Sequence, residues 1–235
     1  SGNDGKLIWE KTGDDPKGAF GRSAKGVGDL NNDGHSDILV GEPYQIWGAP
    51  INGNSIDRAG KFHVLSGKDG SILKTWEGEK VGDAFGTACG GSSDGKHTFL
   101  ILGSPNAGEQ NGGKVYIYKD LSDKPAFVFE ADSTGRQYGG MFLSVVGDVD
   151  ADGTPDIYSS DWANAALGRG TGRAYIHSGK TGELIYVWTG ETPGDGFGIG
   201  VSDAGDLNSD GHADLIIASW QHGGKAPSGG KCYVY

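Results

Sequence analysis

Residues 206–214 read Asp-Leu-Asn-Ser-Asp-Gly-His-Ala-Asp, and two near-copies of this pattern lie at 29–37 (Asp-Leu-Asn-Asn-Asp-Gly-His-Ser-Asp) and 148–156 (Asp-Val-Asp-Ala-Asp-Gly-Thr-Pro-Asp). Each copy has oxygen-bearing side chains at positions 1, 3, 5 and 9 and a glycine at position 6. Calcium is bound by six to eight oxygens, and glycine lets the chain turn sharply enough for them to converge. The EF-hand loop opens similarly but ends on a Glu at position 12. The pattern therefore predicts three shorter calcium loops.

We expect the ligands to be the side chains at positions 1, 3, 5 and 9 and the main-chain carbonyl at position 7. The three predicted Ca²⁺ sites are Asp29, Asn31, Asp33, His35 and Asp37; Asp148, Asp150, Asp152, Thr154 and Asp156; and Asp206, Asn208, Asp210, His212 and Asp214. The two histidines at position 7 are expected to point to solvent. An acidic turn that binds no metal is the alternative, and the presence of three near-copies argues against it.

The spacing of the loops indicates a repeat. Their first residues lie at 29, 148 and 206, so the last two copies are 58 residues apart and the first two 119. Half of the longer interval predicts a further copy near residue 89. Residues 90–98 (Gly-Gly-Ser-Ser-Asp-Gly-Lys-His-Thr) keep the Asp-Gly turn but have Gly90 and Thr98 where aspartates are expected. A fixed period of this length is typical of repeat architectures. We therefore predict four repeats, of which the second carries a vestigial hairpin.

Short runs rich in β-branched and aromatic residues flank every loop. In each repeat the second run follows the loop, as at 215–219 (Leu-Ile-Ile-Ala-Ser). The third run begins at a glycine, as at 60–65 (Gly-Lys-Phe-His-Val-Leu), and the fourth follows a glycine turn, as at 72–76 (Ile-Leu-Lys-Thr-Trp). Runs of this kind between Gly and Asp turns predict β-strands. Four strands per repeat around an axis make the blade of a β-propeller. We predict an all-β propeller of four four-stranded blades in one domain, residues 1–235, with repeats at about 10–76, 77–130, 131–188, and 189–235 plus 1–9.

The repeats resemble a known family. An aromatic-Gly pair precedes each loop (Phe20-Gly21, Phe85-Gly86, Tyr138-Gly139, Phe197-Gly198), and a Gly-x-Pro follows two of the four. This order resembles the FG-GAP repeat of integrin α-subunit propellers and of many bacterial surface proteins, over essentially the whole chain. The sequence departs from the pattern in the degraded loop of repeat 2 and at 159–161 and 218–220, where Gly-x-Pro is replaced. The resemblance implies metal-bearing hairpins on the face opposite the usual ligand surface.

The two ends of the chain predict how the ring closes. The last residues, 231–235 (Lys-Cys-Tyr-Val-Tyr), read as a third strand, and residues 1–9 (Ser-Gly-Asn-Asp-Gly-Lys-Leu-Ile-Trp) match the turn and fourth strand that should follow it. We therefore expect the N-terminal strand to complete the last blade, since closure removes aggregation-prone sheet edges. A piece of a seven-bladed propeller is the rival interpretation.

Composition limits the classes of function. The formal charge is −11, and three divalent ions would reduce it to −5, so much of the acidity belongs to the loops. The chain has no stripe of Lys and Arg, which argues against nucleic acid. No apolar run approaches the roughly 18 residues of a membrane span. Calcium loops of extracellular modules fill at about 10⁻⁴–10⁻³ M, which favours an extracellular or cell-surface location, with the periplasm as a further possibility.

The sequence contains no recognisable catalytic motif, and the chain is not expected to be an enzyme. The loops that join second and third strands vary in length and carry aromatic and basic residues, as binding loops on rigid scaffolds do. Candidates for a ligand face there are Tyr44, Trp47, Trp162 and Trp220, with Arg58, Arg169 and His222 beside them. The alternative is that these aromatics cap the blades.

Three hypotheses of function follow. The first is a calcium-binding, non-enzymatic recognition or adhesion module whose protein or carbohydrate ligand binds opposite the calcium loops. The second is the propeller domain of a carbohydrate-active or phospholipid-cleaving enzyme, because propellers of this family accompany such activities. The third is an architectural spacer. Fold alone does not choose among them.

Overall fold

The computed structural model describes residues 1–15, 17–46, 49–50 and 57–235 as an all-β protein. Its strands form antiparallel sheets in the chain order that the repeats predict. The first sheet has the order β1-β2-β5-β6, the second β10-β9-β8-β7, the third β11-β12-β13-β14 and the fourth β15-β16-β17. Their bounds are β1 Ser23–Gly28, β2 Asp37–Glu42, β5 Lys61–Leu65 and β6 Ile72–Glu77; β7 Cys89–Ser93, β8 Thr98–Ser104, β9 Lys114–Tyr118 and β10 Phe127–Glu130; β11 Leu143–Val146, β12 Asp156–Asp161, β13 Arg173–His177 and β14 Leu184–Thr189; β15 Phe197–Gly205, β16 Asp214–Ser219 and β17 Lys231–Val234. A short hairpin, β3 Gln45–Ile46 and β4 Ala49–Pro50, extends from the first sheet.

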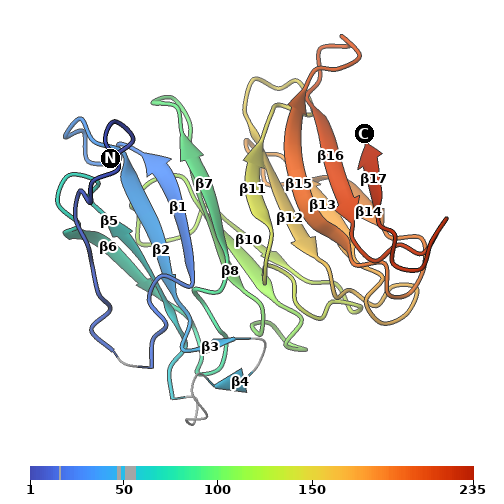
Figure 1. Ribbon diagram of the computed structural model, residues 1–235, viewed down its shortest axis with the longest axis horizontal. Helices are drawn as coiled ribbons and strands as arrows, with labels where there is room; N and C mark the ends of the chain where they lie inside the picture. The colour runs from blue at the N-terminus through green and yellow to red at the C-terminus, as the bar shows by residue number, and fades with distance from the viewer. Residues whose placement is uncertain (16, 47–48, 51–56) are drawn as a thin grey trace.

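The four sheets stand next to one another in a propeller-like arc (Figure 1). The first strand of each sheet lies against that of the next, β1 against β7, β7 against β11 and β11 against β15. The chain therefore runs from one end of the arc to the other, as the colour gradient in Figure 1 shows. This succession of antiparallel sheets is consistent with a propeller-like fold.

Three hydrophobic clusters hold the sheets together, one at each junction between neighbours. The aromatic residue of each Phe-Gly or Tyr-Gly pair after the first is central to its junction. Phe85 packs edge-on against both Phe62 and Tyr116, and Tyr138 meets Tyr175 in the same way. Edge-to-face aromatic pairs add about 0.5–1.5 kcal/mol to the burial of apolar area. The repeated aromatic residue therefore stabilises the contact between blades.

Glycines in the second strands let the backbone approach the aromatic-Gly pair of the next repeat. A Cβ on Gly41 or Gly103, in the second strand of a sheet, would overlap the carbonyl oxygen of Gly86 or Gly139 in the next repeat. In the third sheet Ser160 replaces this second-strand glycine, and the hydroxyl of Tyr158 donates to the Gly198 carbonyl at 2.9 Å. The loss of Gly-x-Pro in repeat 3 is thus accommodated by a tyrosine contact.

The fourth sheet differs from the prediction, because it has three strands instead of four. Residues 1–10 form no strand and do not complete this sheet. The indole of Trp9 donates to the Gly67 carbonyl at 2.8 Å, in the turn between β5 and β6, just as Trp76 of β6 donates to the Ser122 carbonyl of the second repeat at 2.9 Å. The N-terminal segment therefore docks on the first sheet as an outer strand docks on the sheet that follows it, and the predicted closure is not seen.

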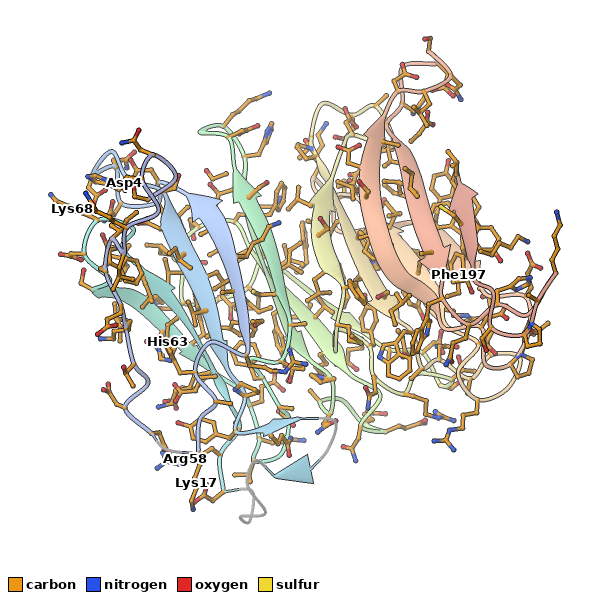
Figure 2. All side chains as sticks on the ribbon, in the orientation of Figure 1. Asp4, Lys17, Arg58, His63, Lys68 and Phe197 are labelled. Atoms are coloured by element: carbon orange, nitrogen blue, oxygen red, sulfur yellow. The ribbon has the colours of Figure 1, made fainter. Side chains whose placement is uncertain are left out.

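The hairpin tips and the connections of the sheets lie at two opposite ends. We call the end with hairpin tips 29–37, 90–98, 148–156 and 206–214 the Asp-loop face. The opposite end, with the described connection residues 43–46, 49–50, 57–60, 105–113, 162–172 and 220–230, is the connection face. In the first sheet Lys68 marks the Asp-loop face and Arg58 the connection face (Figure 2). Strands of four to nine residues separate the two faces, so a ligand on one does not touch the other.

Candidate metal sites and a groove on the opposite face

The three Asp-rich loops share one pattern of hydrogen bonds. In loop 148–156, the carboxylate at position 1 (Asp148) accepts the backbone N–H groups of Asp152 at 3.0 Å and Gly153 at 2.7 Å. Position 3 (Asp150) accepts the Asp152 N–H at 3.2 Å, and position 5 (Asp152) accepts the Thr154 N–H at 3.0 Å. Loops 29–37 and 206–214 repeat these bonds residue for residue. The backbone therefore holds the carboxylates in place.

Backbone conformation explains the glycine of the motif. At position 6, Gly34, Gly153 and Gly211 have φ between 86° and 89°. This left-handed region is open to glycine and costly for other residues. Position 4 is also left-handed, at Asn32, Ala151 and Ser209, with φ between 59° and 61°. Two left-handed residues within three positions turn the chain back on itself and bring the carboxylates to one side.

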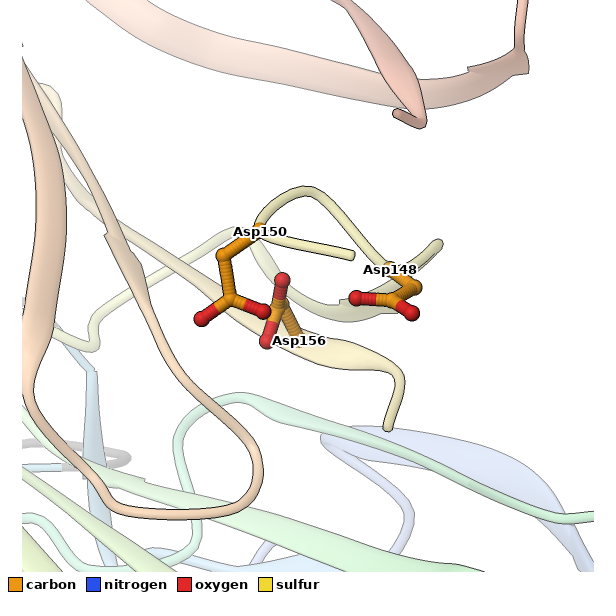
Figure 3. Close-up of side chains that lie close together, drawn as sticks. All are labelled: Asp148, Asp150 and Asp156. Atoms are coloured by element: carbon orange, nitrogen blue, oxygen red, sulfur yellow. The ribbon is translucent and has the colours of Figure 1, made fainter. Parts of the chain in front are cut away.

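Loop 148–156 gathers the most charge. One ligand oxygen from each of Asp148, Asp150 and Asp156 lies within 4.8 Å of the others, and the three carboxylates face one another in Figure 3. The pKa of Asp156 is raised to about 6, first by burial and then by the charges of Asp150 and Asp148. Hydrogen bonds from Gly179 and Val149 oppose this shift. A divalent cation would offset the repulsion, so the donor set fits a hard metal ion such as Ca²⁺.

Position 9 ties each loop to its own sheet. The carboxylate of Asp37 accepts the Leu30 N–H at 2.8 Å and the Gly67 N–H at 3.1 Å. Asp156 makes the same two bonds to Val149 and Gly179, at 2.8 and 3.0 Å. Each glycine lies in the turn that follows the third strand. The last loop lacks this second bond among the described residues: Asp214 accepts the Leu207 N–H at 2.6 Å, and its sheet has no fourth strand.

Sequence reasoning missed the contribution of these turns. The hydroxyl of Ser66 donates to Asp33 at 3.3 Å, and that of Ser178 donates to Asp152 at 3.4 Å. The signal was present in the repeated Ser-Gly-Lys-x-Gly of residues 66–70 and 178–182, which the sequence identifies only as turns. The serine of the turn donates to position 5 and the glycine donates to position 9. The turn therefore supports the loop from outside.

The position-7 histidines behave differently from each other. His35 is exposed, as predicted. The ring of His212 is exposed too, but its Nδ1 lies 2.7 Å from the Val149 carbonyl oxygen in the neighbouring loop. The backbone N–H of Ala213 also donates to the Asp148 carbonyl at 3.0 Å. The last two loops are therefore joined, which the sequence of either loop alone does not indicate.

The hairpin of repeat 2 has one carboxylate at its tip. Asp94 accepts the backbone N–H groups of His97 at 2.6 Å and Lys96 at 2.8 Å, and these bonds lower its pKa to about 2. The hydroxyls of Ser93 and Thr98 lie 2.8 Å apart across the hairpin. Side-chain hydrogen bonds thus close this turn, in keeping with its interpretation as a vestigial loop.

The residues predicted for a ligand face differ in how exposed they are on the connection face. Tyr44 is only 4% exposed, and burial raises its pKa to about 12, so its ring is not an exposed anchor. Trp47 lies outside the described residues. Trp162 is half-buried and lines a groove between the third and fourth sheets, and Trp220 is 51% exposed beside it. The tryptophans of the C-terminal half are the ones that the structure brings together.

The histidines near this face are held by neighbouring side chains. His63 Nε2 lies 3.0 Å from a Glu42 oxygen, and its Nδ1 lies 2.9 Å from the Thr75 hydroxyl. His222 Nδ1 lies 3.2 Å from the buried carboxylate of Asp195. These contacts occupy both ring nitrogens of His63 and one of His222. Such contacts are typical of histidines that stabilise the structure.

Comparison with known proteins agrees with the repeat pattern. The FG-GAP repeat family model matches residues 20–65. Integrin alpha pat-2 of Caenorhabditis briggsae is 28% identical over 172 residues, 64% of this chain and 14% of that protein. Integrin alpha-3 of Cricetulus griseus is 29% identical over 182 residues (68% and 17%), and integrin alpha-5 of Xenopus laevis 27% over 222 (86% and 20%).

The chain therefore spans between about a seventh and a fifth of the length of these relatives. Nowhere in the described part of the chain is there a helix of the length and apolar character that a membrane span requires. The family match begins at Phe20 of the first aromatic-Gly pair and ends with the third strand of the first sheet. Together with the sheet order, these matches show an FG-GAP repeat at residues 20–65 and a similarity to integrin α-subunits over most of the chain.

Proposed function

We propose that this chain is a calcium-binding recognition domain of a secreted or cell-surface protein, without catalytic activity of its own. The observation that carries the proposal is the shared geometry of the three Asp-rich loops. In each loop backbone N–H groups orient the oxygens at positions 1, 3 and 5, while position 9 is tied to the loop backbone. Such a preorganised set of hard oxygens suits Ca²⁺.

The role proposed for the ion is structural. Each loop holds three or four carboxylates at one hairpin tip, where they repel one another without a cation. An ion that binds only the folded loop stabilises the folded state by mass action. Three ions, one for each intact loop, would hold the Asp-loop face of the first, third and fourth sheets.

The recognition role is proposed for the connection face. Its loops differ in length and rest on a rigid sheet scaffold, where binding residues are commonly found. Trp162 and Trp220 offer aromatic surface there. The similarity to integrin α-subunits supports a protein ligand and an extracellular setting, and a carbohydrate ligand is proposed on the exposed aromatic surface alone. The enzyme-associated and spacer hypotheses become outcomes of the tests below.

Ion stoichiometry tests the metal half of the proposal. Equilibrium dialysis with millimolar Ca²⁺ should find three ions per chain, and the double variant Asp206→Ala/Asp210→Ala should hold two and remain folded. Asp94→Ala is the matched control, because Asp94 is the lone carboxylate at the equivalent tip of repeat 2. Three ions in the double variant, or none in the unaltered chain, would contradict the assignment.

Array binding tests the recognition half. The immobilised domain in Ca²⁺ should capture a ligand from a panel of extracellular proteins and glycans, and Trp220→Ala should weaken capture about tenfold or more, as loss of an aromatic anchor does. Tyr186→Ala is the control, since Tyr186 is 48% exposed but lies on β14, away from the connection face. Blank panels would favour the spacer, and turnover of a polysaccharide would favour the enzyme.

A further inference from the structure

A groove of about 720 Å³ lies on the connection face between the third and fourth sheets. This volume is within the 300–1,000 Å³ of typical small-ligand sites. Segments from four parts of the chain meet there: the loop before β11, the β12–β13 connection, the loop before β15, and the residue after Trp220. The residues that matter for its chemistry are Arg136, Gln137, Trp162, Arg169, Gly196 and Gln221.

A buried carboxylate fixes the shape of the groove. Asp161, which is fully buried at the end of β12, accepts the backbone N–H groups of Arg136 at 2.8 Å, Gln137 at 3.1 Å and Ala163 at 3.2 Å. The side-chain amide of Asn164 also approaches it at 3.4 Å. Four donors compensate this charge, and they fasten the loop before β11 to the β12–β13 connection. The walls of the groove are therefore preorganised.

The other walls are fixed as well. The backbone N–H of Gly194 donates to the Arg169 carbonyl at 3.0 Å, which joins the two sheets across the groove. The indole of Trp220 packs directly against Gly196, whose φ of 62° is left-handed, and a Cβ at Gly196 would overlap that ring. Glycine is needed there for the tryptophan to lie at the edge of the groove.

Two guanidinium groups in the groove have no carboxylate partner. Arg136 and Arg169 are exposed, and neither forms an ion pair within the described part of the chain. The nearby carboxylates are already engaged: Asp161 by the donors above, Asp195 by Thr192 and His222, and Glu191 by Lys231 and Tyr233. Arg136 Nη1 donates to the Gly135 carbonyl at 2.6 Å, which leaves its charge without a counter-ion among the described residues. In a chain of formal charge −11, a site with two arginines that lack a carboxylate partner is complementary to an anion.

Two residues that line the groove each carry a polar atom without a hydrogen-bond partner. Trp162 Nε1, a donor, and Gln137 Oε1, an acceptor, are both buried and unpaired within the described residues. A buried polar group without a hydrogen-bond partner destabilises the protein. A ligand that offers both an acceptor and a donor beside its anionic group would remove this destabilisation.

We propose that the groove binds a carboxylated carbohydrate, a chain of uronic acid residues, which deepens and rests on the recognition function proposed above. The sugar carboxylate would pair with Arg136 and Arg169, since guanidinium groups bind carboxylates with paired hydrogen bonds. A sugar hydroxyl both donates and accepts, so it can serve Gln137 Oε1 and Trp162 Nε1. The apolar face of the ring would pack on indole. An acidic peptide side chain brings the carboxylate but no adjoining hydroxyl.

Matched oligosaccharides test this inference. Titration calorimetry with the full chain should show binding of β-1,4-linked glucuronic acid oligomers and at least about tenfold weaker binding of cello-oligosaccharides of equal length, which differ only at the carboxylate. Arg136→Gln/Arg169→Gln should weaken glucuronate binding about tenfold or more, as expected for losing charge-assisted hydrogen bonds. Trp162→Phe keeps an aromatic ring but removes the N–H donor and part of the indole surface, so its loss of binding should be smaller than that of the double arginine variant.

Lys68→Gln/Lys96→Gln is the control, because it removes the same charge from exposed residues on the Asp-loop face. An equal loss in this control, or equal binding of the neutral oligosaccharide, would overturn the inference. An oligoglutamate peptide that binds the groove in place of glucuronate would overturn the carbohydrate class and leave the recognition function standing. If neither anion binds and the arrays are also blank, the recognition function itself fails.

Discussion

Excess EDTA is expected to lower the melting temperature of this domain by about 5–10 °C relative to a buffer with millimolar CaCl₂. Millimolar Ca²⁺ is about ten times the dissociation constant of a loop that fills near 10⁻⁴ M, and an ion at this excess stabilises the folded state by about 1.4 kcal/mol. In a domain of 150–250 residues, 1 kcal/mol shifts the melting temperature by about 2–4 °C. Two filled loops therefore give a shift of this size, and scanning calorimetry with and without EDTA measures it.

The loops provide their own control. A chain with Asp29→Ala, Asp148→Ala and Asp206→Ala loses position 1 of every intact loop, and with it the acceptor of two backbone N–H groups in each. Its melting temperature should be lower and no longer respond to EDTA. Identical melts of the unaltered chain in Ca²⁺ and EDTA would refute the structural role of the ions.

The loops and strands could be predicted from sequence because their causes are local. A left-handed glycine at position 6 and side chains that bond to backbone two to five residues away define each loop within nine residues. The alternation of strands and turns likewise fixes the sheets, and the aromatic-Gly pairs mark the junctions between them. Local determinants repeated at a constant period are what a single sequence shows best.

Closure of the ring could not be predicted because it depends on curvature. Residues 1–9 match a fourth strand, but the pattern does not say which sheet receives it. Curvature is set by three extensive junctions between sheets, each built from side chains far apart in the sequence. In the resulting arc, Trp9 finds its indole acceptor at Gly67 of the first sheet. A repeat pattern specifies the blade, and packing between blades specifies the arc.

Only some of the residues that line the groove could be predicted from the sequence, for a similar reason. Trp162 and Trp220 could be identified because they are aromatic residues in loops of variable length. Arg136 and Gln137 belong to the segment before β11, outside those loops, and only the hydrogen bonds of Asp161 bring them to the site. Tyr44 shows the opposite error, since a loop tyrosine that seemed available is buried.

The second large effect comes from His177, whose imidazole resists protonation in the folded protein. Its side chain is 9% exposed at the end of β13, and its ring stacks on Phe129 with 3.8 Å between centroids. Its Nδ1 has no hydrogen-bond partner among the residues described. Burial lowers its pKa from the ordinary value of 6.5 to about 4. The imidazole is therefore neutral in the folded protein at pH values where it is charged in the unfolded chain.

The sign of the pH dependence follows from proton uptake. Between pH 6.5 and about 4 the unfolded chain binds a proton at His177 that the folded chain does not, so stability falls as the pH falls. One pKa unit corresponds to 1.36 kcal/mol, so the loss reaches about 3 kcal/mol near pH 4. Urea unfolding at a series of pH values from 7 to about 4 should show this loss on top of the contribution of the carboxylates.

His177→Leu isolates the effect, because Leu65 occupies the equivalent position at the end of the third strand in the first sheet. The variant should unfold with at least the stability of the unaltered chain at pH 7. On acidification the difference in unfolding free energy between the two proteins should grow by about 3 kcal/mol in favour of leucine, while the carboxylates affect both alike. Parallel stability profiles over this pH range would show that the imidazole takes up its proton without unfolding, and that the third sheet accommodates the charge.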